Sequence, residues 1–380
     1  MIIGIDIRML ARGTKSGIEE YIINLLSNML RLDNNIKYKL FYNGYKKVEL
    51  EYDFLKLSNV TLKEFKIPNR LFDFFSQYFH YPKIDKLLGG VDIFFSPHIF
   101  SAPVSKNCKV ITTFHDLSFE NHKKFYSTSK NYWHFSMNPK SQAQRSNKII
   151  AVSESTKKDL TKIYKIETEK IKVIYSGIGL EYGIWNMESR ILEVKKKYNL
   201  PENYILYLGT LEPRKNIIGL IKAFEILNSK FKIQNSKFKL VIAGSKGWLY
   251  EDIFKTVRNS PVKDDIIFTG FIEDKDKSVL YNLADLFVYP SFYEGFGFPP
   301  LEAMATGTPV ITSNFSSLPE AVGNAAIMVN PYNLDELAKA MKMILTDEKL
   351  RDILIKRGLK QTKKFSWQNC AEETLKFVLS

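Results

Sequence analysis

The chain has 380 residues, more than one ordinary domain needs and about the length of two. Hydrophobic residues make up 45% and charged residues 25%, a balance that is typical of soluble globular proteins and excludes disordered, collagen-like and coiled-coil chains. The net charge of +14 is uneven, because residues 1–200 hold 32 Lys and Arg against 20 Asp and Glu, whereas residues 201–380 hold 23 against 21. The basic first half favours an anionic partner, either nucleic acid or a membrane surface, although a solvated Lys-rich surface explains it equally well.

Cysteine usage and apolar runs point to a cytoplasmic protein. Cys108 and Cys370 are too few for a disulfide framework, and no CxxC pair or Cys/His cluster predicts structural zinc. The apolar opening is interrupted by Asp6 and Arg8 and is too short for a signal peptide or a membrane span. No later stretch reaches the ~18 uninterrupted apolar residues of a spanning helix.

The first half of the chain predicts a doubly wound α/β domain. An apolar, β-branched run at 2–7 is followed by a polar, Gly-containing loop at 12–17 and a helical pattern over 18–32. A second helix is predicted at 155–165 from its N-terminal Ser-x-x-x-Asp pattern. Further short apolar runs predict buried strands at 38–42, 91–96, 109–114, 148–152 and 171–174.

An aromatic run at 70–81, RLFDFFSQYFHY, has two interpretations. The spacing of Leu71, Phe74, Phe75 and Phe79 is that of a helix packed on its sheet, which is the interpretation that we favour. Phe72 or Tyr78 is then the residue expected at the surface. The alternative is a wedge that enters a membrane.

The second half predicts another α/β series after a Lys-rich linker at 186–203. Two Rossmann-like domains in series would bind a ligand beyond the carboxyl ends of their parallel strands. The predicted strands lie at 204–208, 239–243, 266–269, 286–289, 309–312 and 326–329, and the predicted helices at 217–227, 275–284, 301–305 and 334–345.

Residues 291–302, SFYEGFGFPPLE, form the first motif. Gly295 and Gly297 allow a close backbone approach to a ligand, and a helix that begins near Pro299 points free N–H groups at them. Glu294 and Glu302 flank this anion-binding turn and can accept hydrogen bonds from hydroxyl groups. A phosphate between two polyols describes a sugar nucleotide, whereas a plain Gly/Pro turn with two surface glutamates is the alternative.

Residues 209–216, GTLEPRKN, form the second motif, directly after a predicted strand. Arg214 and Lys215 stand at a helix start, where two cations oppose the helix dipole. An anionic diphosphate would explain them, and a basic surface turn is the alternative.

Two weaker signals lie in the first half. Residues 112–116, TTFHD, put His115 and Asp116 at the end of a predicted strand, and one histidine by itself is more often structural. The loop 13–17 could hold an oxyanion. It does not match GxGxxG, and the chain has no GxxxxGK[ST], which argues against a dinucleotide oxidoreductase and a P-loop NTPase.

Together these motifs resemble family 4 glycosyltransferases with a GT-B fold, in which two Rossmann-like domains face each other across a cleft. Residues 291–310 resemble the family's E-x7-E region, and the resemblance covers nearly the whole chain. GTLEPRKN with HDL is most similar to the bacterial mannosyltransferase branch. The other segments that occur in the family's order are FHDLSFE, AVSESTKKDL and the FSW at 365–367.

The resemblance implies domain boundaries and a reaction. It implies an acceptor domain at 1–185, completed by a C-terminal helix at 366–380, and a donor domain at 204–365. It implies retaining transfer of a hexose from a nucleoside-diphosphate sugar, most specifically mannose from GDP-mannose, to a glycan or lipid-linked acceptor in surface polysaccharide or lipopolysaccharide synthesis. No cofactor or metal is then required, and the Asp274–Asp276 pair is a polar helix start.

The resemblance also assigns roles to residues. Arg214 and Lys215 neutralise the leaving diphosphate, Glu302 accepts from the ribose, and Glu294 holds hydroxyls of the donor hexose. His115 lies against the donor sugar. The remaining expected residues are Asp116 (orienting His115 or contacting acceptor), Gly13 and Gly17 (acceptor floor, Gly17 also donor), Gly270, Phe271 and Ile272 (base), and Gly209, Gly295, Phe296, Gly297, Phe298 and Leu301 (donor).

Other functions stay open at this point. Rhamnosyl-, glucosyl- and GlcNAc-type transferases share these motifs, and a sugar-nucleotide epimerase shares the fold but would need more acid/base residues than the His115–Asp116 pair. The basic first half leaves a nucleic-acid-binding protein as an alternative of another class, although no nucleic-acid motif supports it. It equally predicts peripheral binding to an anionic membrane, with Lys123, Lys124 and Lys130 as one contact surface.

Overall fold

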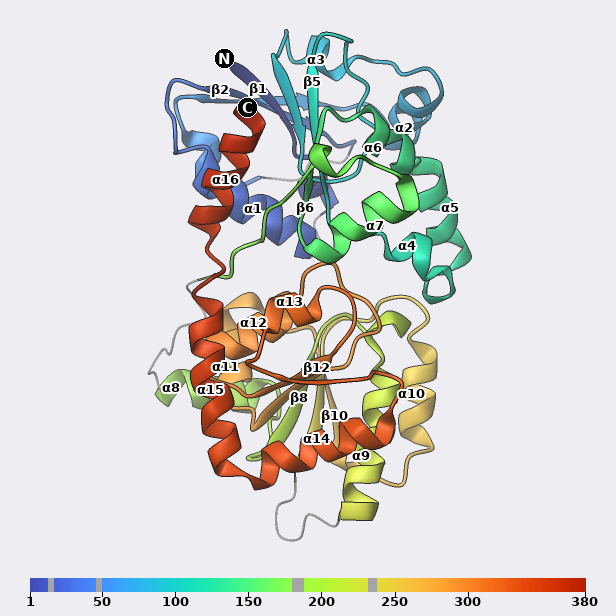
Figure 1. Ribbon diagram of the computed structural model, residues 1–380, viewed down its shortest axis with the longest axis vertical. Coiled ribbons are helices and arrows are strands. Elements are labelled where there is room, and N and C mark those ends of the chain that lie inside the picture. The colour runs from blue at the N-terminus through green and yellow to red at the C-terminus, as the bar shows by residue number, and fades with distance from the viewer. Residues whose placement is uncertain (13–16, 46–49, 180–187, 232–237) are drawn as a thin grey trace. The chain divides into compact units, whose positions relative to one another are not determined.

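The computed structural model describes residues 1–12, 17–45, 50–179, 188–231 and 238–380. Contacts divide the chain into two compact units (Figure 1). Unit 1 comprises Met1–Leu117, Thr128–Gly177 and Ser366–Ser380, and unit 2 comprises Ser118–Ser127 and Ile178–Phe365. Each unit is an α/β body around its own parallel sheet, so the expected pair of Rossmann-like domains is confirmed.

Unit 1 is built on a seven-stranded sheet with the strand order β3-β2-β1-β4-β5-β6-β7. Every neighbouring pair is parallel, and the inner strands are buried apolar runs because helices cover both faces. The strands are β1 (Ile2–Asp6), β2 (Lys37–Asn43), β3 (Val60–Phe65), β4 (Ile93–Ser96), β5 (Lys109–Phe114), β6 (Lys148–Ala151) and β7 (Ile171–Val173). The α-helices are α1 (Gly17–Met29), α2 (Asn69–Tyr78), α3 (Ile84–Leu87), α5 (Thr128–Met137), α6 (Pro139–Arg145), α7 (Glu154–Tyr164) and α16 (Trp367–Leu379).

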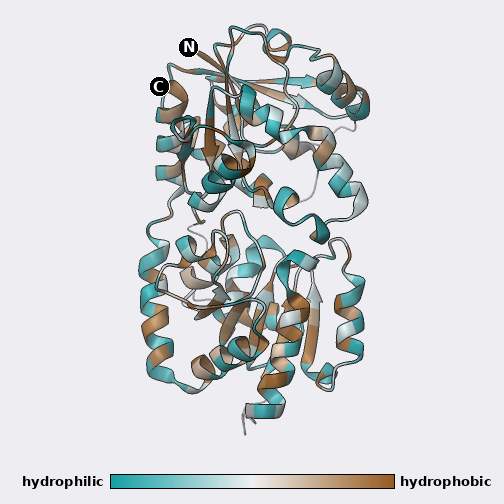
Figure 2. Ribbon diagram, turned by 45° about the vertical axis from the view of Figure 1, so that its right-hand side comes forward, coloured by the Kyte–Doolittle hydropathy of each residue, from teal (hydrophilic) through white to brown (hydrophobic). Residues whose placement is uncertain are grey.

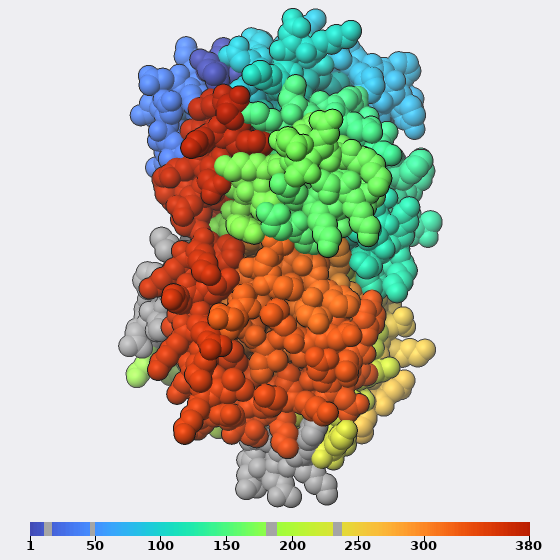
Figure 3. Space-filling model, in the orientation of Figure 1, coloured from blue at the N-terminus to red at the C-terminus, as the bar shows by residue number. Residues whose placement is uncertain are grey.

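The C-terminal helix α16 packs against α1 within unit 1, and in Figure 3 its red residues lie beside the blue N-terminal ones. Lys148 Nζ donates to the Phe377 carbonyl at 2.9 Å, which ties the helix to β6. The chain approaches itself closely at the start of α16, where a Cβ on Gly177 would lie 2.2 Å from the Trp367 nitrogen. Only glycine fits at position 177, because any side chain there would collide with the backbone of Trp367.

Unit 2 is built on a six-stranded parallel sheet with the strand order β10-β9-β8-β11-β12-β13. Figure 2 shows its strands as predominantly hydrophobic, while the outer helices carry hydrophilic residues on their other faces. The strands are β8 (Tyr204–Leu208), β9 (Lys239–Ala243), β10 (Ile266–Gly270), β11 (Leu286–Tyr289), β12 (Val310–Ser313) and β13 (Ile327–Val329). The α-helices are α4 (Ser118–Asn121), α8 (Glu188–Lys197), α9 (Ile217–Phe231), α10 (Glu251–Arg258), α11 (Asp274–Asn282), α12 (Phe298–Ala305), α13 (Leu318–Val322), α14 (Leu334–Thr346) and α15 (Glu348–Thr362).

The expected linker at 186–203 is corrected by the structure, because its described part contains α8. Arg190 and Lys197 of α8 both pair with the fully buried Asp276 of α11, and Tyr198 donates to the same carboxylate at 2.8 Å. Two of the basic residues that suggested a linker, Arg190 and Lys197, are therefore the partners of a buried acid. Asp276 is held in this ion-pair cluster, and Asp274 begins α11.

The expected core packing of residues 70–81 is wrong. Phe72 is buried in the core with Phe41 and Phe94, whereas Phe74, Phe75 and Phe79 are exposed. Of the two residues expected at the surface, Tyr78 is exposed and Phe72 is not. The buried face of this short helix contains Phe72 and Ser76, and the apolar stripe lies on the exposed face.

The residues 118–127 were expected in the first domain, and the structure places them in unit 2. Phe125 stacks on Phe292 with ring centroids 5.2 Å apart, and Trp248 Nε1 donates to the Phe125 carbonyl at 2.6 Å. Lys123 and Lys124 therefore belong to unit 2, while Lys130 belongs to unit 1. The assignment of Lys123 and Lys124 to the first domain is therefore wrong, and the membrane contact predicted for the three lysines stays a prediction.

None of the helices in the described ranges combines the length and the apolar character that a bilayer crossing requires.

Candidate active site

The GTLEPRKN motif follows β8 at the carboxyl edge of the unit 2 sheet, as the sequence predicts. Two loops cross tightly here, because a Cβ on Gly244 would lie 2.0 Å from the Gly209 carbonyl oxygen. Residues Pro213–Lys215 form one 3₁₀ turn, which ends at Asn216 in the left-handed conformation, φ 56°. The Asn216 side chain donates to the carbonyls of Pro290 and Pro331, so this turn is fastened to the neighbouring loops.

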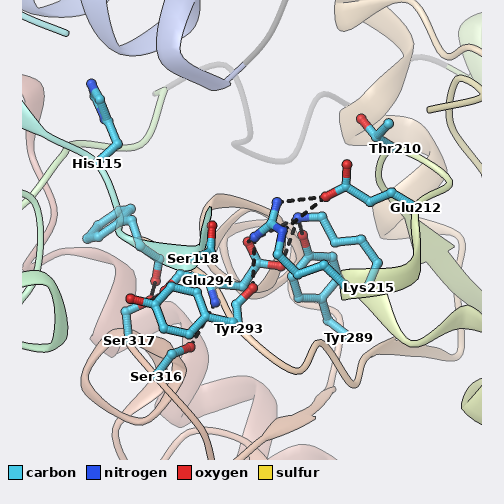
Figure 4. A network of polar contacts seen from close by, with 12 residues as sticks. His115, Ser118, Thr210, Glu212, Lys215, Tyr289, Tyr293, Glu294, Ser316 and Ser317 are labelled. Carbon is cyan, nitrogen blue, oxygen red and sulfur yellow. Dashed lines mark hydrogen bonds and ion pairs between the residues drawn. The ribbon is translucent and has the colours of Figure 1, made fainter. Parts of the chain in front are cut away.

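Lys215, Arg214 and Glu294 form one buried network (Figure 4). Lys215 Nζ lies 2.7 and 3.0 Å from the two Glu294 carboxylate oxygens and 2.6 Å from the Tyr289 hydroxyl. Arg214 reaches Glu294 Oε2 at 3.1 Å and the Tyr293 carbonyl at 2.7 Å, and it pairs with Glu212 Oε1 at 2.7 Å. The sequence predicted Arg214, Lys215 and Glu294 from two motifs 80 residues apart, and the fold brings them into direct contact.

The charged groups of this network are paired, and burial together with the pairing shifts the pKa values of Glu294 and Lys215. Burial would raise the pKa of Glu294, but Lys215 and Arg214 outweigh it and hold that pKa at about 2. Burial, with the charge of Arg214, lowers the pKa of Lys215 from its ordinary value, and Glu294 offsets part of that effect. Two cations and the carboxylates of Glu212 and Glu294 leave the cluster neutral as a whole.

The Gly-rich turn before α12 is held by two serines (Figure 4). Ser316 Oγ accepts from the Glu294 backbone N–H at 2.8 Å, and Ser317 Oγ lies 2.9 Å from the carbonyls of both Glu294 and Phe296. Gly297 caps α12 at φ 118°, where a side chain would be strained, and Phe298 begins the helix. These serines were not singled out from the sequence, because their only signal is position in the loop after β12.

The other expected donor residues lie in α12, after β10 and in the Gly-rich turn itself. Glu302 and Leu301 lie in α12, both buried, and Glu302 accepts from the Tyr281 hydroxyl at 2.7 Å. Gly270 ends β10 at φ 74°, with Phe271 exposed and Ile272 buried after it. Gly295 lies in the turn that Ser316 and Ser317 hold.

His115 and Asp116 follow β5 in unit 1. His115 Nε2 lies 2.9 Å from the Pro97 carbonyl, and its ring packs edge-on against Tyr21 at 4.8 Å. A carbonyl only accepts, so Nε2 carries the proton, and burial lowers the pKa of His115 in spite of the opposing effects of Pro97 and Asp116. The neutral ring then presents Nδ1 as an acceptor.

The carboxyl edge of β1 holds an ion pair that sequence reasoning missed. Arg8 donates to both Asp6 oxygens, at 2.6 Å from Nη2 to Oδ2 and 3.0 Å from Nε to Oδ1, and its guanidinium lies over the rings of Phe41, Phe72 and Phe100. In the sequence, Asp6 and Arg8 are noticeable only as charged residues that interrupt the apolar N-terminal run. The pairing of an acid with an arginine two residues later, directly after a strand, is the signal that could have found them. Gly17 begins α1, and Gly13 lies outside the described residues.

Within the part of the chain that the structure describes, no group of three or more His, Cys, Asp and Glu side chains could hold a metal ion.

Comparison with known proteins identifies the family. Residues 190–361 match the model "Glycosyl transferases group 1", and residues 15–182 match "Glycosyltransferase Family 4". The chain is 34% identical over 269 residues to O-antigen chain mannosyltransferase B of Escherichia coli, covering 70% of this chain and 69% of that protein. It is 36% identical over 266 residues to the serotype-specific mannosyltransferase WbdA of the same organism, covering 69% of this chain but 32% of WbdA.

The fold has many solved counterparts. The sucrose-phosphate synthase of Thermosynechococcus elongatus superposes with a TM-score of 0.77 at 20% identity, covering 99% of this chain and 98% of that one. At that identity the likeness shows the fold, which is GT-B. The two family matches, the identity to mannosyltransferase B and this fold together show that the chain belongs to glycosyltransferase family 4, with bacterial O-antigen mannosyltransferases among its relatives.

Proposed function

We propose that the chain transfers mannose from GDP-mannose to a glycan or lipid-linked acceptor of a surface polysaccharide, with retention of anomeric configuration. The observation that carries the proposal is the buried contact of Lys215 and Arg214 with Glu294 at the carboxyl edge of the unit 2 sheet. Mannose as the sugar is supported by relatives that are named as O-antigen mannosyltransferases. A cytoplasmic site of action fits a nucleotide-sugar donor.

The network supports an exchange of partners when the donor binds. In the free protein the Lys215 ammonium donates to Glu294 and Tyr289. A diphosphate oxygen that accepts from Lys215 takes over part of this pairing, and the Glu294 carboxylate becomes available to hydroxyls of the hexose. Lys215 and Arg214 then stabilise the negative charge that grows on the phosphate as it leaves.

Retention follows if the acceptor hydroxyl attacks on the face from which the phosphate departs. The bond from the anomeric carbon to the phosphate oxygen breaks, the bond to the acceptor oxygen forms, and the departing phosphate takes the hydroxyl proton. Glu302 is assigned to the ribose, and the backbone at Gly270, Phe271 and Ile272 is assigned to the base. In unit 1, neutral His115 is assigned to a hydroxyl of the donor sugar, Asp116 and Gly17 to the acceptor.

We propose that transfer needs no metal, because Lys215 and Arg214 can donate to the diphosphate once they exchange their carboxylate partners for it. Activity should persist in excess EDTA. A reversible loss that Mg²⁺ or Mn²⁺ restores would refute metal independence.

The donor is tested by thermal shift with GDP, UDP, ADP and TDP and their sugars. A ligand at 100 times its Kd adds ~2.7 kcal/mol of stability, so the true donor should stand out. Product formed from GDP-mannose is then analysed by NMR for the anomeric configuration. Stabilisation by UDP or TDP sugars alone would replace mannose by another sugar, and inversion would overturn the front-face reaction.

A further inference from the structure

Helix α2 turns its apolar stripe away from the core of unit 1. Leu71, Phe74, Phe75 and Tyr78 occupy positions i, i+3, i+4 and i+7, which is one face of a helix, and all four are exposed. Phe74 is 49% and Tyr78 67% exposed. An amphipathic helix of a soluble domain ordinarily buries this face, so α2 has one that the described unit does not cover.

The exposed side chains form a continuous surface. The Phe74 ring lies 5.6 Å from Phe75, 5.0 Å from Tyr78 and 5.9 Å from Phe79, measured between ring centroids. Helix α5 lies beside α2, because Gln77 of α2 contacts Met137 of α5. Helix α5 itself carries Tyr132 and Phe135, which are 69% and 82% exposed. Figure 1 shows α2, α5 and α6 close together in unit 1. We call Leu71, Phe74, Phe75, Tyr78, Phe79, Tyr81, Tyr132 and Phe135 the aromatic face.

The two segments that carry the aromatic face are rich in cations. Residues 66–86 and 128–147 contain seven Lys and Arg against two Asp, a balance of +5. One of the two acids, Asp85, is buried and accepts from the Ser105 N–H at 2.8 Å. Arg70 of α2, Lys140 of α6 and Arg145 of α6 are all exposed, and Arg145 contacts His80 beside Phe79.

We propose that the aromatic face binds the surface of an anionic lipid bilayer. Apolar Phe rings and Tyr rings, which end in a polar hydroxyl, suit the boundary between headgroups and acyl chains, and nearby cations are attracted to anionic headgroups. A second copy of the chain is the other possible occupant of an apolar face. It would bring the like charges of two basic surfaces together, so the charge favours the bilayer. This inference goes beyond the proposed transfer reaction and does not depend on it.

The test uses the full-length protein and sedimentation with two kinds of vesicle, phosphatidylglycerol with phosphatidylcholine, and phosphatidylcholine alone. We expect binding to the anionic vesicles that weakens with salt, and at least ten-fold weaker binding to the neutral ones. Absence of binding to both, or equal binding to both, overturns the proposal.

Variants then locate the contact. F74S/Y78S/F135S removes three exposed rings, and it should lower the partition coefficient on anionic vesicles at least ten-fold. The matched control L192S/M343S/I353S removes three exposed apolar side chains of unit 2 and should bind like the wild type. R70Q/K140Q/R145Q should lower binding about 100-fold at low salt, since each cation contributes about five-fold.

The same variants distinguish the bilayer from self-association. The melting temperature of F74S/Y78S/F135S should equal that of the wild type, because these side chains are exposed. Unchanged vesicle binding by this variant overturns the proposal, and a change from dimer to monomer in analytical ultracentrifugation with vesicle binding retained assigns the face to a second copy. Thermal shift by the nucleotide donor, measured without vesicles, tests the proposed function separately.

Discussion

An ion pair between an acid and an arginine lies at the end of β1 in unit 1 and in the loop after β8 in unit 2, with different surroundings. Arg8 pairs with Asp6 and Arg214 pairs with Glu212, in both cases an acid and an arginine two residues later. In unit 1 three aromatic rings and the Ser101 carbonyl surround the arginine. In unit 2 the arginine also meets Glu294, which Lys215 shares.

The difference distinguishes an ion pair that stabilises a loop from one that belongs to a candidate ligand site. The Arg8–Asp6 pair is neutral and enclosed, so it holds the loop after β1. The unit 2 network adds a lysine and a glutamate that can change partners when an anion binds. A buried ion pair is weak evidence of function by itself, and the additional charged residues are what suggest a ligand.

Lys215→Ala is expected to have the largest effect on activity, and it tests whether the unit 2 network is catalytic. We expect turnover to fall about 10- to 1000-fold, because one electrostatic donor to the leaving group is lost. The protein should stay folded, since Arg214 still pairs with Glu294. Steady-state kinetics and circular dichroism measure both, and near-normal turnover would remove Lys215 from the catalytic role.

Arg214→Ala and Arg8→Ala form a matched pair. Each leaves a buried carboxylate without its cation, which costs about 3–5 kcal/mol, so both should lower the denaturation midpoint. Only Arg214→Ala should also weaken nucleoside-diphosphate binding, measured by titration calorimetry at a temperature where both variants are folded. Equal loss of binding in the two variants would contradict the distinction between the units.

Glu294→Gln tests the unit 2 network through the pH dependence of the free energy of unfolding. Because the pKa of Glu294 is about 2 in the folded protein and ordinarily 4.5, the unfolded chain binds a proton there that the folded protein does not. The free energy of unfolding therefore falls as pH decreases through this window, by about 3 kcal/mol for this group, and is fully present above it.

The Gln variant should lose that part of the acid dependence and be less stable at pH 7, because Lys215 and Arg214 lose a charged partner. Denaturant midpoints at pH 7 and pH 3 measure this. The same acid dependence in variant and wild type would show that Glu294 is not the group responsible.

Phe271→Ser is expected to have the smallest effect. Its side chain is 56% exposed, so stability should change by no more than about 0.5 kcal/mol. Loss of a contact with the base should raise the KM for the donor several-fold without changing kcat. An unchanged KM would move the base away from residues 270–272.

Local patterns predicted most strands well, because buried parallel strands are short apolar runs. The exception was β3, which alternates between partly buried and exposed residues and lies at the sheet edge. Helix α8 was missed because its charged residues pair with Asp276, far away in the sequence. Residues 118–127 were assigned to the wrong unit for the same kind of reason, since Phe292 and Trp248 hold them.

The sequence by itself determined the family, the two-domain α/β fold and the candidate residues Arg214, Lys215 and Glu294, because short motifs at strand ends encode them locally. The tertiary structure alone decided which charges are paired. It joined Glu294 to Lys215, enclosed Arg8 with Asp6, and left the stripe of α2 exposed while burying Phe72. These outcomes depend on contacts between segments far apart in the chain, and the helical period that placed Phe74 and Phe75 on one face could not say which face the sheet would cover.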